Sequence, residues 1–438
     1  MIDFKRKTIT LLTAIMLIVS MTVPSWAASS ATRPQVTAKG AVVYCENTGE
    51  VVYSHYMNRR LDPLSVTKLM TVMLAVQYLP LDREVTVSAD AAAQGESTMG
   101  LVAGEKLTVR DLIYGALLPS GNDAAYALGE AVSGDMKSFL KLMNDTAENI
   151  GCENTHFANP NGLKVKNHYS TAYDIMQIAR VAFSNSVVAK VAGTREYTVP
   201  ATNKSGKRVL KSHVSFIENQ STGIYAGKTG YWDDGNASIA LGYEKDGLRM
   251  IIVVLGDQSA ERTTDVKAML KYATSKVTGI KVIDEGKAAG KVRVKHGAKT
   301  RIEAYAGETG YAYLPKEASK SLISTKTEMN EVTAPVRKGD IVGKYEIYVA
   351  GDLVNEVDLV AQNDVQVGWF TSYLGISNMA AVILLLILLV VLCLMIFIII
   401  ARARYKRKKK LERQRRIKEM ARRQLEKEQD QEKRGWTF

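Results

Sequence analysis

The chain has 438 residues, of which 46% are hydrophobic and 24% are charged, and its formal net charge is +13. This composition excludes a largely disordered chain, and the length is sufficient for two domains with separate cores. The positive charge is unevenly distributed, because 16 Lys and Arg residues stand against 6 Asp and Glu residues from Arg402 onward. The excess charge therefore does not indicate a nucleic-acid-binding protein.

Residues 1–27 have the features of a secretory signal peptide. A Lys-Arg-Lys run at 5–7 precedes the apolar residues 8–23, and Ser25-Trp26-Ala27 supplies small residues for cleavage. The apolar stretch is short for a membrane span, although an uncleaved anchor is the alternative. We predict a mature chain that begins near Ala28, with its body outside the cytoplasm.

Residues 36–275 form the first predicted domain, which mixes strand and helix patterns. Strand-like sequence surrounds a turn at 46–49, and the spacing of apolar residues predicts helices at 64–79, 107–118, 136–150 and 171–183. Thr171 and Asp174 resemble a capping box at the start of the last helix. Strands at 237–243 and 248–255 flank a Glu-Lys-Asp-Gly turn and predict a hairpin. The fold class is α+β, an antiparallel sheet covered by helices.

A second pattern begins near residue 277 and predicts a small all-β domain at 277–365. Polar and apolar residues alternate with period two in three short runs, at 291–295, 300–305 and 345–349. Residues 362–378 are expected to be a short link to a membrane segment.

Met379–Ala401 predicts a transmembrane helix. It is 23 residues long without a charge, and as a helix it reaches roughly 34 Å, enough for a hydrocarbon core of about 30 Å. The cations of Arg402–Lys410 follow at once, so the positive-inside rule places the tail 402–438 in the cytoplasm. We expect a single-pass plasma membrane protein whose basic tail contacts anionic lipids; for residues 412–434 a solvated helix is the alternative.

The chain has three cysteines, Cys45, Cys152 and Cys393. Three cysteines exclude a disulfide-stapled fold, and the sequence does not decide whether Cys45 and Cys152 are bridged. The five histidines form no cluster with metal-ligand spacing, so neither a metal nor a cofactor is expected.

Three short motifs carry the chemistry. Ser65-Val66-Thr67-Lys68 comes first, Ser120-Gly121-Asn122 follows, and Lys228-Thr229-Gly230 is the third. Each motif alone is a weak signal, but the three in this order match the signature of acyl-transferring serine enzymes that react with penicillin.

The first motif places a base beside a nucleophile. Lys68 lies one helical turn after Ser65, so its amine can approach the Ser65 hydroxyl and remove its proton. A lysine serves as a base only if its pKa is lowered, and burial next to a second cation, Lys228, would lower it. Ser65 is therefore assigned as the nucleophile, Lys68 as the base and Lys228 as the neighbouring cation.

The other motif residues are assigned to substrate. Ser120 can relay a proton to the leaving amine, and Asn122 can hydrogen-bond a substrate amide. Lys228 and Thr229 can bind a carboxylate, and Gly230 is expected to leave room for the substrate backbone. The amides of Ser65 and Tyr231 are candidates for the oxyanion hole. Arg262 could add positive charge to this pocket, although we favour a surface salt bridge for it.

These motifs and their surroundings resemble the D-alanyl-D-alanine carboxypeptidases, the low-molecular-mass penicillin-binding proteins. Further similarity lies in the block Asp111–Ala125, in the loop Phe157–Leu163, and in His168–Ala172. The resemblance implies a penicillin-binding-protein or β-lactamase-like transpeptidase domain that removes the terminal D-Ala from peptidoglycan stem pentapeptides. It also implies acylation of Ser65 by β-lactams.

Leu64 departs from the Ala that is usual before the nucleophile, and the full span departs from the surface helix common in the family. A serine β-lactamase shares the three motifs, but residues 159–167 contain no glutamate to activate water. A catalytically idle wall-binding scaffold is the other alternative. The sequence does not identify the deacylation base, the preferred form of peptidoglycan or the oligomeric state.

Overall fold

The computed structural model describes residues 32–218 and 222–434, so the predicted signal peptide lies outside the described residues. The chain divides into two compact units. The first runs to Val282 and includes Gly310–Thr325 and Ile347–Asn355, and the second contains Ile283–Thr309, Lys326–Glu346 and the chain from Glu356 onward. The second unit is therefore assembled from separated segments of the chain.

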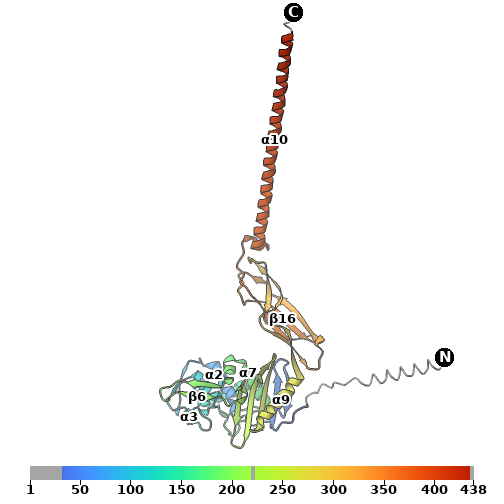
Figure 1. Cartoon of the computed structure of the whole chain (residues 1–438). Coiled ribbons are helices and arrows are strands. Elements are labelled where there is room, and N and C mark those ends of the chain that lie inside the picture. Colours follow the sequence, from blue (N-terminus) through green and yellow to red (C-terminus); the bar gives the residue numbers. More distant parts are fainter. Residues whose placement is uncertain (1–31, 219–221, 435–438) are drawn as a thin grey trace, which may run out of the picture. The chain divides into compact units, whose positions relative to one another are not determined.

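A five-stranded antiparallel sheet forms the centre of the first unit (Figure 1). Its order is β2-β1-β9-β8-β7, with bounds Gly40–Cys45 (β1), Glu50–His55 (β2), Ile224–Tyr231 (β7), Asn236–Lys245 (β8) and Leu248–Gln258 (β9). The predicted hairpin is confirmed as β8 and β9, which pair in antiparallel register. The third motif lies at the end of β7, an edge strand.

Both faces of this sheet are buried, because alternate residues of β9 point into two different cores. Ile251, Val253 and Leu255 pack into the core that contains α2 (Lys68–Tyr78) and most other helices. Their neighbours Met250, Ile252 and Val254 pack into a second core, which includes Val266 and Met269 of α9 (Arg262–Lys276). Helix α9 was not predicted from the sequence.

The four predicted helices are present in the first unit with shifted ends, and two short helices, at 89–92 and 186–192, were not predicted. Their bounds are Ala89–Ala92 (α3), Val109–Leu117 (α4), Asn122–Ser133 (α5), Met136–Asn149 (α6), Ala172–Ser184 (α7) and Ser186–Ala192 (α8). The first predicted helix begins with a 3-10 turn, η1 (Leu64–Thr67), before α2. Helix α4 starts later than predicted, because Lys106–Thr108 forms a strand (β4) that pairs with β3 (Glu84–Thr86).

The predicted capping box of α7 is only half present. The Thr171 side chain accepts a hydrogen bond from the Asp174 amide at 3.0 Å, as an N-cap does. The Asp174 carboxylate does not return to the cap. It accepts instead from the amide of Asn154 and the hydroxyl of Thr155, and so ties α7 to the loop before it.

The strands after α9 confirm the predicted all-β character. A six-stranded sheet has the order β14-β16-β17-β12-β11-β15, with bounds Ala288–Lys295 (β11), Arg301–Ala306 (β12), Ile323–Met329 (β14), Val332–Thr333 (β15), Ile341–Val349 (β16) and Asp352–Ala361 (β17). The three predicted runs lie within, or begin one residue before, β11, β12 and β16. A two-stranded sheet pairs β10 (Val277–Ile283) with β13 (Gly310–Pro315).

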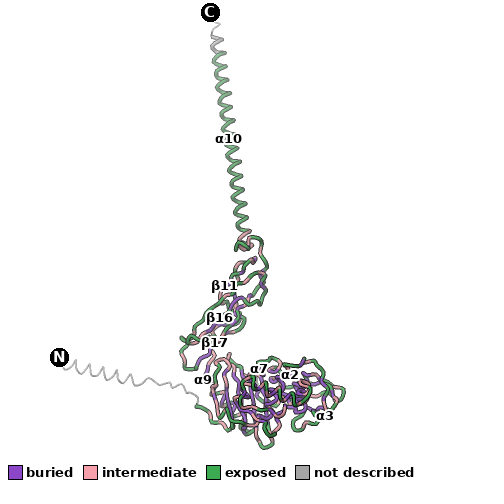
Figure 2. The backbone as a smooth tube through the Cα atoms, turned by 180° about the vertical axis from the view of Figure 1, so that it is seen from behind, coloured by how far each residue is buried: buried purple, intermediate pink, exposed green. Residues whose placement is uncertain are grey.

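The chain ends in a single long helix, α10 (Asn378–Arg434), which contains the predicted span. Figure 2 shows α10 as exposed, and every residue from Val382 to Gln429 is exposed. Within the part of the chain that the structure describes, α10 is the one helix long and apolar enough to cross a membrane.

Candidate active site

A cleft of about 280 Å³ brings the three motifs together at the end of β7. Five predicted site residues line it: Ser65, Ser120, Asn122, Thr229 and Tyr231. The two motif lysines lie beneath the cleft with no exposed surface. A larger hollow of about 690 Å³ is lined by Gly193, Arg195 and their neighbours, but it contains no motif residue. The chemistry therefore belongs to the smaller cleft.

The turn that carries Ser65 is held in an uncommon backbone conformation. Leu64 has φ of +55°, a left-handed value that is rare for a leucine. Two glycines pack so closely against this turn that neither position has room for a side chain. A Cβ on Gly162 would lie 1.9 Å from the Leu64 carbonyl oxygen, and a Cβ on Gly230 would lie 2.7 Å from the Leu64 Cβ. Such conformations persist only where the surrounding structure holds them.

The position of Gly230 changes its predicted role. Its missing side chain would point at Leu64, at the Ser65 amide nitrogen (3.0 Å) and at Ser238 Oγ (2.3 Å), which lie inside the protein. The sequence suggested instead that this glycine makes room for the substrate backbone. We find that the glycine allows β7 to pack directly against the nucleophile turn.

Lys68 is the centre of the polar contacts. Its Nζ lies 2.9 Å from Ser65 Oγ, 2.7 Å from Asn122 Oδ1 and 2.6 Å from the carbonyl oxygen of Asn161. Asn122 is fixed in turn by a hydrogen bond from its Nδ2 to the carbonyl of Gly95. The first two motifs are thus joined through the lysine amine.

These contacts suit a neutral amine. Complete burial lowers the pKa of Lys68 well below its ordinary value, and the nearby charge of Lys228 lowers it further. A neutral amine has two hydrogens and one lone pair. The hydrogens can go to the Asn122 and Asn161 oxygens, which leaves the lone pair free to accept the Ser65 proton.

Ser120 is bonded to the third motif. Lys228 donates from Nζ to Ser120 Oγ at 2.9 Å and to the carbonyl of Thr229 at 2.7 Å. Ser120 has φ of +63°, so the turn before α5 aims its hydroxyl by means of another uncommon conformation. Between the described side chains of Ser120 and Lys68 there is no hydrogen bond, although the proton relay inferred from the sequence would use one. Such a relay therefore requires a small movement or the substrate itself.

Arg262 lies beside the third motif, and the surface salt bridge favoured from the sequence is wrong. Its Nη1 donates to the carbonyls of Gly230 (3.2 Å) and Ser238 (3.3 Å), and no ion pair among the described residues involves Arg262. Burial lowers the pKa of Lys228 to about 7, and the charge of Arg262 contributes to this shift. The guanidinium thus acts on the charge of Lys228 at the end of β7.

The loop Asn159–Leu163 is fastened beneath the nucleophile. Thr71 donates to the carbonyl of Pro160 at 2.6 Å. His168 accepts from the Ala158 amide at Nδ1, so its Nε2 carries the proton and faces Thr67 Oγ1 at 3.0 Å. Burial lowers the pKa of His168 to about 4, and this keeps the ring neutral in the contact.

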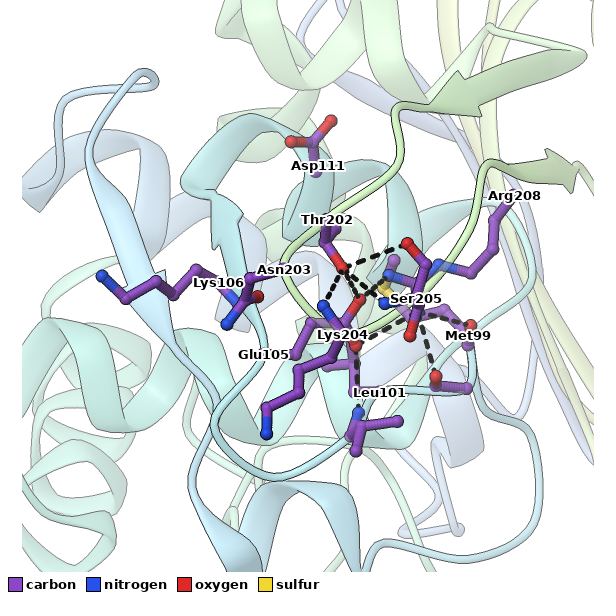
Figure 3. Close-up of polar contacts among 12 residues, drawn as sticks. Met99, Leu101, Glu105, Lys106, Asp111, Thr202, Asn203, Lys204, Ser205 and Arg208 are labelled. Atoms are coloured by element: carbon purple, nitrogen blue, oxygen red, sulfur yellow. Dashed lines mark hydrogen bonds and ion pairs between the residues drawn. The ribbon is translucent and has the colours of Figure 1, made fainter.

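A second polar network fixes the segment that precedes α4 (Figure 3). The Asp123 carboxylate accepts from the amides of Met99 and Leu101. Glu105, whose side chain is 0% exposed, accepts from Thr202 Oγ1 at 2.7 Å and forms an ion pair with Arg208. Because Glu96 and Ser97 of the same segment line the cleft, this network supports one wall of the site.

Five lining residues were missed by sequence reasoning: Glu96, Ser97, His213, Trp232 and Asp233. Only Trp232 and Asp233 had a local signal, since they directly follow the third motif. The others reach the cleft from the connection before β4 and from the second residue after β6 (Arg208–Lys211), and no spacing in the sequence indicates this. Asn161, which bonds Lys68 through its backbone, was noted only within the family-like loop.

The geometry places a serine hydroxyl beside a buried lysine amine, an arrangement suited to serine acyl transfer. Residues 27–259 match the D-alanyl-D-alanine carboxypeptidase family, and residues 278–367 match the penicillin-binding protein 5 C-terminal domain. The chain belongs to the D-alanyl-D-alanine carboxypeptidase family, which confirms the resemblance seen in the motifs.

Individual relatives agree with this membership. The chain is 31% identical to D-alanyl-D-alanine carboxypeptidase DacF of Bacillus subtilis over 350 residues, 77% of this chain and 88% of DacF. It is 29% identical to DacC of Escherichia coli over 353 residues, 77% of this chain and 86% of DacC. The structure of penicillin-binding protein 5 from Haemophilus influenzae superimposes with a TM-score of 0.55 at 26% identity, covering 76% of this chain and 99% of that one.

Proposed function

We propose that this protein is a membrane-anchored serine D-Ala-D-Ala carboxypeptidase that removes the terminal D-alanine from peptidoglycan stem pentapeptides. The observation that carries the proposal is the 2.9 Å contact between Ser65 Oγ and the buried amine of Lys68. A serine hydroxyl becomes a nucleophile when a base of lowered pKa lies within hydrogen-bond reach, and Lys68 meets both conditions.

The reaction follows from these positions. Lys68 takes the Ser65 proton as Ser65 Oγ attacks the carbonyl carbon of the penultimate D-alanine. The peptide bond breaks, the leaving D-alanine amine takes a proton delivered by way of Ser120, and an ester remains on Ser65. Water then hydrolyses this ester and restores the hydroxyl. The amides of Ser65 and Tyr231 are proposed to stabilise the oxyanion.

Substrate recognition is assigned to the second and third motifs. The substrate ends in a carboxylate, and Lys228 with Thr229 is proposed to bind it at the end of β7. Lys228 carries part of its charge near pH 7, and a bound carboxylate would raise its pKa again, because an opposite charge favours the protonated form. Asn122 is proposed to hydrogen-bond the substrate amide.

The test is release of D-alanine. The full chain in detergent is incubated with a pentapeptide ending in D-Ala-D-Ala, and free D-alanine is measured against the Ser65→Ala variant. Release by the natural protein and none by the variant supports the proposal. A β-lactamase would instead turn over nitrocefin rapidly, and an idle scaffold would not be labelled by fluorescent penicillin, so either result would reject the carboxypeptidase assignment.

The membrane topology belongs to the same proposal. Seven cations in Arg402–Lys410 border only one side of the apolar part of α10, and each favours the anionic inner face by about 1 kcal/mol. The catalytic body is therefore proposed to lie outside and the tail inside. Protease added to intact, wall-stripped cells should remove the body and leave a stub ending at Phe438. Loss of an epitope at Phe438 in those cells would overturn the orientation.

A further inference from the structure

The segment between the last strand and α10, predicted from the sequence as a short link, makes ordered contacts with the all-β unit. Val365 forms an isolated bridge with Val336, and Val367 forms one with Gly297. The short helix η5 (Phe370–Leu374) follows and ends at Gly375 in a left-handed conformation. The chain from β17 to α10 is therefore packed against the all-β unit.

The first residue of α10 is held by the same unit. The Asn378 amide donates to the carbonyl of Ala298 at 3.1 Å, and Asn378 Oδ1 accepts from the Trp369 amide at 2.9 Å. The Tyr373 ring stacks on His296 with centroids 4.2 Å apart. These contacts leave no flexible spacer between the all-β unit and the start of the apolar helix.

Four large apolar side chains on this packed segment face solvent. Trp369 is 55% exposed, Phe370 81%, Tyr373 64% and Leu374 76%. We call these four residues the apolar collar. Exposed aromatic residues gathered within six positions mark a contact surface, because a soluble protein covers such groups. One face of the Tyr373 ring lies against His296, and all four side chains still remain more than half exposed.

We propose that the apolar collar inserts into the interfacial layer of the outer leaflet and seats the all-β unit directly on the membrane. Trp and Tyr prefer this layer, where an aromatic ring can meet both lipid and water. The inference rests on the proposed topology, in which Met379–Ala401 spans the bilayer with the body outside.

Chain length makes lipid the occupant that the observations favour. Met379 is five residues after Leu374, so even an extended chain places the two within about 18 Å, and the contacts at Asn378 hold them closer. No charged residue occurs from Val365 to Ala401 to keep this stretch out of the interface. Arg293 lies beside Gly375, since its Nη2 would be 3.5 Å from a Cβ at that position. In the proposed arrangement it supplies a cation at the level of the lipid phosphates.

The first test uses tryptophan emission from the full chain in phosphatidylcholine vesicles with brominated acyl chains. We expect the Trp369 contribution, obtained by subtracting the Trp369→Phe variant, to be blue-shifted and strongly quenched. Trp232 in the catalytic cleft is the matched control, and the Trp232→Phe difference should be unquenched. Equal quenching of both contributions, or none of Trp369, would overturn the proposal.

The second test measures thiol labelling of introduced cysteines. The native cysteines should contribute little to the labelling, since Cys45 and Cys152 are buried and Cys393 lies within the span. In vesicles, Phe370→Cys should react with a water-soluble maleimide far more slowly than Ile341→Cys, an exposed control at 52%. Equal rates reject the collar. A Phe370→Cys protein that instead crosslinks to a second copy would make the surface a dimer contact and also reject it.

Two further measurements on the same vesicles separate the collar proposal from the proposed topology and activity on which it rests. Resistance to alkaline extraction reports the span, and D-alanine release reports the catalytic site. If both persist while Trp369 is unquenched, only the collar proposal fails. If alkaline extraction removes the protein, the span itself is wrong, and the collar falls with it.

Discussion

Lys228 Nζ donates a hydrogen bond to Ser120 Oγ at 2.9 Å, which joins the second and third motifs across 108 positions of sequence. Lys68 makes the corresponding link between the first and second motifs through Asn122. The two lysines therefore divide the site: one contacts the nucleophile, and the other contacts the residue assigned to proton delivery.

Ser65→Ala should abolish both penicillin labelling and D-alanine release while the protein stays folded, because one hydroxyl in the η1 turn carries no packing. Lys68→Ala should lower the acylation rate by about 10²–10⁴, the usual contribution of a general base. Stopped-flow acylation by a fluorescent penicillin measures both, and circular dichroism monitors the fold. Labelling that survives Ser65→Ala would refute the nucleophile assignment.

The Michaelis constant for a peptide ending in D-Ala-D-Ala should rise as the pH increases above about 7. Lys228 is charged below its pKa, which burial lowers to about 7, and only the charged form attracts the substrate carboxylate. Lys228→Ala should lower the acylation rate strongly. Lys228→Arg should keep part of it with a Michaelis constant independent of pH, since a guanidinium stays protonated. A flat profile in the natural protein would contradict this role.

Arg262→Ala should weaken peptide binding and also move the rise in the Michaelis constant to higher pH. The Arg262 charge helps to lower the pKa of Lys228, so its removal should let that pKa increase. The Arg262→Lys variant, which keeps a charge, should show a smaller displacement. An unchanged Michaelis constant and an unchanged profile would mean that Arg262 only supports the carbonyls of Gly230 and Ser238.

The protein should lose stability between about pH 6.5 and pH 4 through His168. The folded-state pKa of this ring is lowered to about 4, so the unfolded chain binds a proton in that range and the folded chain does not. The stability contribution is complete above pH 6.5 and falls as the pH decreases, by up to about 3 kcal/mol. Urea unfolding of the natural protein and of His168→Gln measures it. His168→Gln should be less stable than the natural protein at pH 7, but its free energy of unfolding should decrease less as the pH falls.

Arg208→Ala should destabilise the protein by about 3 kcal/mol, because it leaves the buried Glu105 carboxylate without its cation. The exposed pair Lys141–Asp145, with side chains 75% and 50% exposed, supplies the control, and Lys141→Ala should change stability by less than about 0.5 kcal/mol. Denaturant titrations compare the two variants. Similar small effects would show that the Glu105–Arg208 pair does not support the cleft wall.

The sequence by itself determined those features of the structure that depend only on residues close together in the chain. A turn sequence between two apolar runs is a local signal, so the β8–β9 hairpin could be predicted from residues 244–247 and the runs beside them. The spacing of Ser65 and Lys68 is set by one helical turn, and their 2.9 Å contact follows from it. Charge and length likewise indicated the apolar part of α10.

The tertiary structure decided the contacts between residues that are distant in the sequence. The Asn161 carbonyl reaches Lys68 across 93 positions, and Arg208 reaches Glu105 across 103. Neither contact has a local pattern, because backbone carbonyls and single charged residues become partners only after the chain has folded. The same reason explains Arg262: the local sequence suggests a surface residue after the last strand, and only the packing of α9 against the sheet brings it to Gly230.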